Sequence, residues 1–182
     1  MEERQAQNVL TQVLFSALNA ERAFVPEFIN KDTLAPLYCV AKKHDVAQVL
    51  SSFVHSNKIE VPSELSEKLQ MEEFVAVYRN EQLKYAFDEI CAAFNEAEIA
   101  FVPLKGVVIR PYYPDENMRT SCDIDILVRE DELDSAVECL KGKGFTCGEK
   151  GFHDVSLYSP NKVHLELHFN LCENIPTLDK VL

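Results

Sequence analysis

The sequence predicts an α+β fold, with a helical N-terminal region over residues 1–98 and an α/β core over residues 99–182. The first region carries apolar residues at helical spacing and no glycine, whereas all five glycines of the chain lie at Gly106 or later. From Ile99 onward, short apolar runs alternate with helical stretches, an order that points to a sheet rather than a helical bundle.

Three helices are expected in the first 60 residues. Asp32 is predicted as the N-cap of the second helix, which runs through Val40, and the third helix is expected over residues 41–54. The first helix is predicted by apolar residues that recur at intervals of three and four before any proline, namely Val9, Leu10, Val13, Leu14, Ala17 and Leu18.

The longest helix is expected to begin after Pro62 and to run to about Glu98. Its apolar residues form one stripe with charged and amide residues between them, a pattern typical of packing surface rather than of a binding site. The stripe consists of Leu65, Leu69, Phe74, Val77, Leu83, Phe87, Ile90 and Phe94.

The elements of the second region follow from changes in period and from turn residues. An Asn/Pro turn at Pro160 between two alternating runs predicts a β-hairpin. In chain order we expect a strand over residues 99–104, a short helix over 106–110, a strand over 122–128, a helix over 130–143, a strand from 145, hairpin strands over 154–158 and 162–169, and a helix from Thr177.

The net charge of −12, from 30 acidic against 18 basic residues, limits the possible partners. A chain this acidic gains little from releasing counterions off a phosphate backbone, so the charge argues against extensive contact with nucleic acid.

The compartment is expected to be the cytoplasm. No apolar run reaches the roughly 18 residues that a membrane span requires, and the first residues lack the basic-then-apolar order of a signal peptide. The six cysteines are scattered with no Cys-x-x-Cys pair, which favours reduced thiols over a disulfide framework.

Two acids interrupt the apolar strand over residues 122–128. Asp123 and Asp125 are two positions apart, so on a strand their side chains point to the same face at roughly 7 Å from each other. Like charges this close need a counter-charge, and a divalent cation with oxygen ligands is the simplest one. The alternative is an edge strand whose polar face meets water.

The last predicted strand offers a third carboxylate. Val163, Leu165 and Leu167 alternate with polar residues, and Glu166 lies on the polar face. If this strand lies near residues 122–128, Glu166 can join the two aspartates in a site suited to Mg²⁺ or Mn²⁺. Such ions clamp the attacking and leaving oxygens of a phosphoryl transfer.

The same strand also carries His164 and His168, which allow a rival hypothesis of a transition-metal site. Residues four apart on a strand lie roughly 13 Å from each other, too far to share one ion. Surface exposure of either histidine is the simpler alternative.

Taken in order, several short motifs resemble the nucleotidyltransferase superfamily that includes DNA polymerase β. Within it they look most like the bacterial group described as uncharacterised nucleotidyltransferases. The resemblance covers about residues 99–170 and rests on Leu104, Lys105 and Gly106, on Tyr113, Pro114 and Asp115, on Met118 and Arg119, on residues 123–128, and on residues 165–168.

The resemblance implies a mixed sheet with helices on one side and a glycine-containing turn that opens a helix facing nucleotide phosphates. It implies Asp123 and Asp125 as the paired metal-binding acids, with Glu166 as the third acid, which helps to deprotonate the acceptor. Lys105, Gly106 and Arg119 are the expected nucleotide-binding residues.

The implied reaction transfers a nucleoside monophosphate (NMP) from a nucleoside triphosphate (NTP) to an acceptor and releases pyrophosphate. Mg²⁺ or Mn²⁺ is the expected cofactor and NTP the co-substrate, with a small molecule or a protein as the acceptor. Relatives in this group are generally longer, so we expect a C-terminal substrate-binding part beyond Leu182.

The sequence departs from the superfamily pattern in two places. Val107 stands where a small residue, often serine, usually follows the glycine, and the spacing to the acids is longer, with Pro111 and Pro114 inside it. Lys105 and Arg119 offer compensating positive charge, unless they only pair with neighbouring acids. The alternatives are therefore a non-catalytic binding or regulatory domain of the same fold, and a metal-dependent phosphohydrolase.

Overall fold

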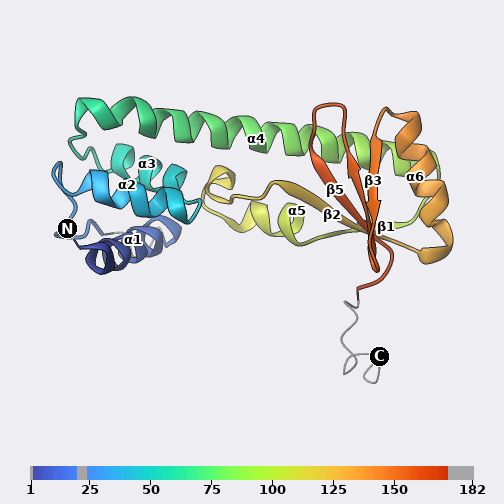
Figure 1. Ribbon diagram of the computed structural model, residues 1–182, viewed down its shortest axis with the longest axis horizontal. Helices are drawn as coiled ribbons and strands as arrows, with labels where there is room; N and C mark the ends of the chain where they lie inside the picture. Colours follow the sequence, from blue (N-terminus) through green and yellow to red (C-terminus); the bar gives the residue numbers. More distant parts are fainter. Residues whose placement is uncertain (1, 20–23, 172–182) are drawn as a thin grey trace, which may run out of the picture. The chain divides into compact units, whose positions relative to one another are not determined.

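The computed structural model describes residues 2–19 and 24–171 (Figure 1). The chain forms two compact units, which we call the helical unit, Met1–Asn80 with Pro111–Thr120, and the sheet unit, Glu81–Arg110 with Ser121–Leu182. These units differ from the regions expected from the sequence because the 34-residue helix α4, Ser63–Glu96, contributes to both.

The helical unit is built from α1, Glu3–Leu18, α2, Leu34–Lys43, α3, Ala47–Ser56, and the first part of α4. The hydroxyl of Ser51 donates to the main-chain oxygen of Leu69 at 2.9 Å, which joins α3 to α4. The core of the unit is a cluster of buried apolar side chains, and its fully buried members include Val13, Leu34, Leu37, Leu50, Val54 and Leu69. Most of the apolar positions of α1 and of the two end portions of α4 therefore mark packing surface, as predicted. The prediction is wrong for Phe74 and Val77 in the middle of the α4 stripe and for Leu18 at the end of α1, whose side chains are 66%, 45% and 41% exposed.

Two expected helix boundaries in this unit are wrong. Thr33, not Asp32, is the N-cap of α2, and the Thr33 hydroxyl bonds back to Phe28 and Asn30 instead of capping the helix. Helix α2 also continues past Ala41 to Lys43. The break before α3 falls at Asp45, whose φ of 55° is left-handed, a conformation that aspartate tolerates better than most residues.

The sheet unit contains a five-stranded sheet in the order β1-β2-β5-β4-β3. β2 and β5 are parallel and the other neighbours are antiparallel, so the sheet is mixed. The strands are β1, Phe101–Leu104, β2, Asp123–Val128, β3, Thr146–Lys150, β4, Asp154–Tyr158, and β5, His164–His168, and the shorter helices are α5, Lys105–Ile109, η2, Arg110–Tyr112, η3, Glu116–Met118, η4, Glu130–Glu132, and α6, Leu133–Gly142.

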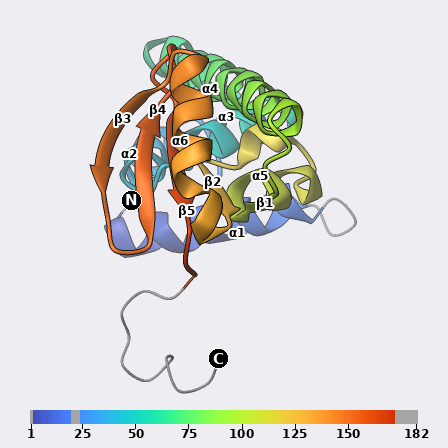
Figure 2. The same cartoon turned by 90° about the vertical axis from the view of Figure 1, so that its right-hand side faces the viewer.

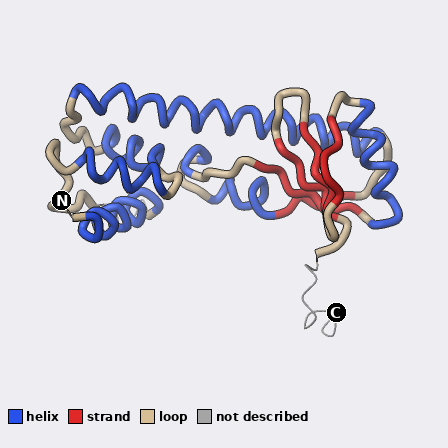
Figure 3. Tube along the Cα trace, viewed as in Figure 1, coloured by secondary structure: helices blue, strands red, loops and turns tan. Residues whose placement is uncertain are grey.

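This arrangement confirms the predicted α+β class, with helices in the first part of the chain and a mixed sheet in the second (Figure 3). The predicted hairpin is also present, between β4 and β5. Its turn is closed by the Ser159 hydroxyl, which accepts from the Val163 amide at 3.0 Å. The helix expected from Thr177 lies outside the described residues. Among the described helices, none is both long and apolar enough to span a bilayer.

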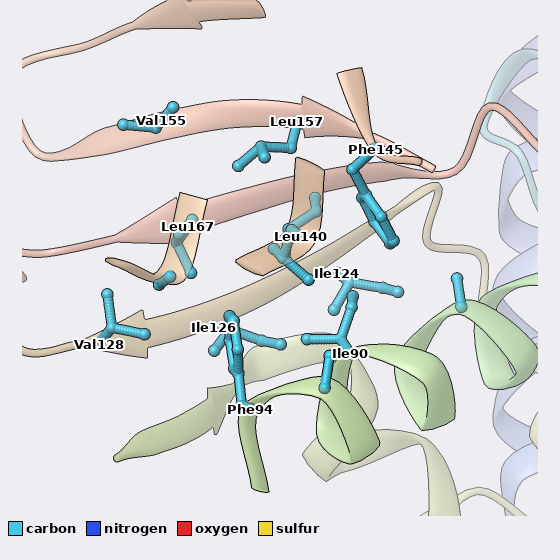
Figure 4. Packing of buried hydrophobic residues seen from close by; sticks show 14 of the residues in the cluster. Ile90, Phe94, Ile124, Ile126, Val128, Leu140, Phe145, Val155, Leu157 and Leu167 are labelled. Atoms are coloured by element: carbon cyan, nitrogen blue, oxygen red, sulfur yellow. The ribbon is translucent and has the colours of Figure 1, made fainter. Parts of the chain in front are cut away.

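One face of the sheet is apolar and carries the core of the unit. Ile124 and Ile126 of β2 and Leu165 and Leu167 of β5 are fully buried, because alternate residues of a strand share a face. They pack against Ile90 and Phe94 of α4 and Leu140 of α6, as Figure 4 shows for the residues that it labels. In Figure 2, α6 lies in front of the strands. Burial of each such side chain contributes roughly 1.5–3 kcal/mol, which holds the opposite, polar face in a fixed register.

Candidate metal and nucleotide site

The polar face of the sheet is defined by Asp123 and Asp125 of β2 and His164, Glu166 and His168 of β5. Because β2 and β5 are parallel and in register, Asp123 is the Cα partner of His164, and Asp125 is the Cα partner of Glu166. The sequence places these residues on one face through period two, and the strand pairing brings the two sets side by side.

Asp125 is the most buried acid of the polar face, with a side chain only 4% exposed. Its Oδ1 accepts from Lys105 Nζ at 3.2 Å and lies 3.1 Å from His168 Nε2. Burial alone raises the pKa of the Asp125 carboxyl, but the hydrogen bonds with His168 and Lys105 outweigh burial, and the pKa is lowered. Asp125 is therefore held as a carboxylate.

Glu166 and His168 complete a cluster around Asp125. His168 Nε2 lies 3.6 Å from Glu166 Oε2, and one ligand atom from each of the three residues falls within 4.8 Å of the others. Asp123 lies outside this group of three. The structure thus brings two of the three predicted metal-binding acids together and adds a histidine.

Lys105 and Gly106 lie at the start of α5, directly after β1. Leu104 is the Cα partner of Asp125, and this pairing carries Lys105 to the polar face. The Lys105 backbone has a φ of 39°, in the left-handed region, and its side chain is 65% exposed although it reaches Asp125. The hydrogen bond to Asp125 raises the pKa of the Lys105 ammonium.

Gly106 is buried within α5, and its main-chain oxygen accepts from the amide of Arg110. Arg119, the other predicted nucleotide-binding residue, follows η3 and belongs to the helical unit. Its amide donates to the main-chain oxygen of Glu116 at 3.4 Å. A nucleotide-binding role for Arg119 stays a prediction.

Sequence reasoning missed His168 as a partner of the acids. Along one strand, His168 and His164 are too far apart to share an ion, and spacing along the strand is all that the sequence provides. The relevant neighbours lie across the strands, since Asp125 is one row away on β2. The alternation in the sequence does place Glu166 and His168 on the same face of one strand. Only the strand order shows that Asp125 lies beside them. His164 itself bonds Ser156 Oγ at 3.2 Å and stays outside the cluster.

The donor set fits a divalent cation. Two carboxylates and an imidazole, converging from neighbouring strands, are ligands that divalent metals accept. A cation is already attracted to this place, since the Lys105 ammonium lies against the Asp125 carboxylate. Asp125, Glu166 and His168 could therefore hold an ion, with Asp123 next to them on the same strand.

No curated protein sequence is significantly similar to this chain. The solution structure of the antibiotic-resistance factor ANT(2'')-Ia is similar with a TM-score of 0.42 and 16% identity, over 50% of this chain. This chain spans 47% of the length of that one. A family described as uncharacterised nucleotidyltransferase matches residues 31–181. The chain belongs to this uncharacterised nucleotidyltransferase family.

Proposed function

We propose that this chain transfers an NMP from an NTP to a small-molecule or protein acceptor and releases pyrophosphate in a metal-dependent reaction. The observation that carries the proposal is the in-register pairing of Asp125 with Glu166 on the polar face, with Lys105 in contact with Asp125. The residues proposed to hold Mg²⁺ or Mn²⁺ are Asp123, Asp125 and Glu166, with His168 beside them, and those proposed to face the nucleotide are Lys105, Gly106 and Arg119.

A bound metal would supply positive charge to the attacking and leaving oxygens of the phosphoryl group. Lys105 would attract the phosphates, because its long side chain is mostly exposed and can exchange the Asp125 carboxylate for a phosphate oxygen. Gly106 has no side chain, so at this position only backbone would face a phosphate bound at the start of α5.

Glu166 is the better candidate for the base that accepts the acceptor's proton. Its side chain is 30% exposed, whereas Asp125 is 4% exposed and engaged by Lys105 and His168. As the hydroxyl proton passes to Glu166, the hydroxyl oxygen bonds to the α-phosphorus. The bond breaks between the α-phosphorus and the oxygen that bridges it to the β-phosphorus, and pyrophosphate leaves with the electron pair of that bond.

A non-catalytic binding or regulatory domain is the second candidate, and one observation favours it. Val107, which follows Gly106, packs against the core of the sheet unit. It therefore contributes to stability, and it offers no hydroxyl for phosphate.

Isothermal titration of an NTP in the presence of Mg²⁺ tests the proposal. We expect the parent chain to bind and the Asp123→Ala plus Asp125→Ala variant to lose binding. A matched control is Asp131→Ala plus Asp134→Ala, which removes the same charge from exposed positions. Equal binding by the parent and the first variant contradicts the proposal.

Release of pyrophosphate separates the remaining alternatives. NTP binding without any pyrophosphate release supports the non-catalytic domain. Pyrophosphate release without transfer of an α-³²P label to an acceptor supports a phosphohydrolase. Transfer of the label to an acceptor supports the transferase if the Asp125→Ala variant no longer labels that acceptor.

A further inference from the structure

The donor atoms around Asp125 have the spacing of neighbouring ligands on one ion. His168 Nε2 lies 3.1 Å from Asp125 Oδ1 and 3.6 Å from Glu166 Oε2. Ligands bonded to a cation at roughly 2.1 Å and at right angles lie about 3 Å apart, and slightly farther apart in a tetrahedral site. One ligand atom from each of the three residues lies within 4.8 Å of the others, so an ion fits among them once the side chains close in on it.

The imidazole of His168 is held in place before any ion binds. Its side chain is 6% exposed, and its ring stacks on the ring of His153 with centroids 5.5 Å apart and planes 19° apart. The amide of Phe169, next to His168, donates to the main-chain oxygen of His153 at 3.0 Å. Nε2 thus faces the two carboxylates from a fixed ring.

We infer that His168 Nε2 ligates the ion directly, together with Asp125 and Glu166, and that the site prefers Mn²⁺ to Mg²⁺. Mg²⁺ strongly prefers oxygen ligands and keeps its waters, whereas first-row transition metals accept imidazole nitrogen readily. This inference rests on the proposed function only in requiring a divalent cation at the polar face. The inference assigns His168 the role of a nitrogen ligand, whereas the three predicted acids offer only oxygen ligands.

Binding of Mn²⁺ to the full chain without nucleotide tests the inference. Free Mn²⁺ is counted by electron paramagnetic resonance, and Mg²⁺ is added as a competitor. We expect one site at which Mn²⁺ binds roughly tenfold or more tightly than Mg²⁺. The electron spin-echo envelope of bound Mn²⁺ should show modulation from a directly bonded imidazole nitrogen.

Two histidine variants provide the matched comparison. His168→Gln keeps a polar group beside Asp125 but removes the imidazole, and we expect it to weaken Mn²⁺ binding about tenfold or more. We expect it to abolish the nitrogen modulation and to leave Mg²⁺ binding almost unchanged. His164→Gln alters the same face of the same strand outside the cluster, and it should match the parent in all three measurements. Circular dichroism melting checks that both variants fold.

Three results would overturn the inference: no Mn²⁺ binding at millimolar concentration, equal affinity for Mn²⁺ and Mg²⁺, or bound Mn²⁺ without nitrogen modulation. The last would make His168 only a hydrogen-bond partner of Asp125. None of these measurements uses an NTP. Failure of the proposed transferase would appear separately, as Mn²⁺ binding with nitrogen modulation but no pyrophosphate release.

Discussion

Asp125 on β2 and Glu166 on β5 are Cα partners in a parallel strand pair, and His168 lies within 3.6 Å of a carboxylate oxygen of each. The acids come from segments far apart in the chain, and the direct pairing of β2 with β5 sets their separation. The buried alternate residues on the other face hold this register, because a slip by one position would turn every side chain over.

Lys105→Met should change nucleotide and metal binding in opposite directions. Loss of the ammonium removes an attraction for phosphate, so we expect the affinity for NTP to fall about tenfold. The same change removes a cation that lies 3.2 Å from Asp125 Oδ1 and competes with a metal, so Mn²⁺ should bind more tightly. Calorimetric titration with each ligand measures both.

Lys141→Met is the control for this pair of effects. Lys141 lies on α6 and pairs with Glu138, away from the polar face. It should leave both affinities unchanged. If Lys105→Met weakened NTP and Mn²⁺ binding alike, a general loss of structure at the start of α5 would be the explanation.

Asp123→Asn should distinguish the role of Asp123 from that of Asp125. Asp123 lies outside the cluster of three, so nucleotide-free Mn²⁺ binding should stay within roughly threefold of the parent value. Under the proposed function Asp123 acts once nucleotide is present, and transfer should fall roughly 100-fold or more. Asp125→Asn should reduce both quantities. Equal losses of Mn²⁺ binding in the two variants would place Asp123 among the nucleotide-free ligands.

The sequence predicted the elements of the sheet unit well because their signals are local. Alternation placed Asp123, Asp125 and Glu166 on strand faces, and the Pro160 turn indicated the hairpin. Its weaker predictions concerned helix ends in the helical unit, where Asp45 and not Ala41 marks the break. A single residue in the left-handed conformation sets that boundary. An aspartate in the sequence is equally compatible with this conformation and with an N-cap, so the sequence alone does not tell them apart.

The role of His168 required strand order, which no local pattern contains. Alternation alone put Glu166 and His168 on the same face, but it gave neither the neighbour of β5 nor the register. Once β2 is known to pair with β5 in parallel, Asp125 falls opposite Glu166 and two residues along the strands from the row of His168. Local pattern was also insufficient for α4. Its apolar stripe runs along the whole helix and did not show that the helix contributes to the cores of two units.

Val107→Ser tests whether packing has displaced a phosphate contact. Serine would restore the hydroxyl that relatives of the superfamily often carry after the glycine, and we expect NTP affinity to rise a few-fold. Val107 is partly buried against the sheet core, so the free energy of unfolding should fall by about 1 kcal/mol. Urea denaturation and calorimetry measure the two effects. A loss of stability with no gain in NTP affinity would favour the non-catalytic domain.

Tyr38 should make stability depend on alkaline pH. It donates to Glu72 Oε1 at 2.9 Å, and burial together with this hydrogen bond raises the pKa of Tyr38 to about 12. In the unfolded chain the phenol ionises near pH 10. The raised pKa means that the folded state favours the neutral phenol, so this contribution is complete below about pH 10 and is lost as the pH rises towards 12.

Urea denaturation at pH 9 and at pH 11 measures this effect in the parent and in Tyr38→Phe. The parent should lose more stability between the two pH values than Tyr38→Phe, which has no phenol at position 38 to ionise. Tyr112→Phe is the control, because Tyr112 is 85% exposed and its removal should leave the pH dependence of the parent unchanged. Identical losses in the parent and in Tyr38→Phe would mean that the bond between Tyr38 and Glu72 does not hold the phenol neutral. The contact between α2 and α4 would then contribute to stability through packing and through the ion pair between Lys42 and Glu72.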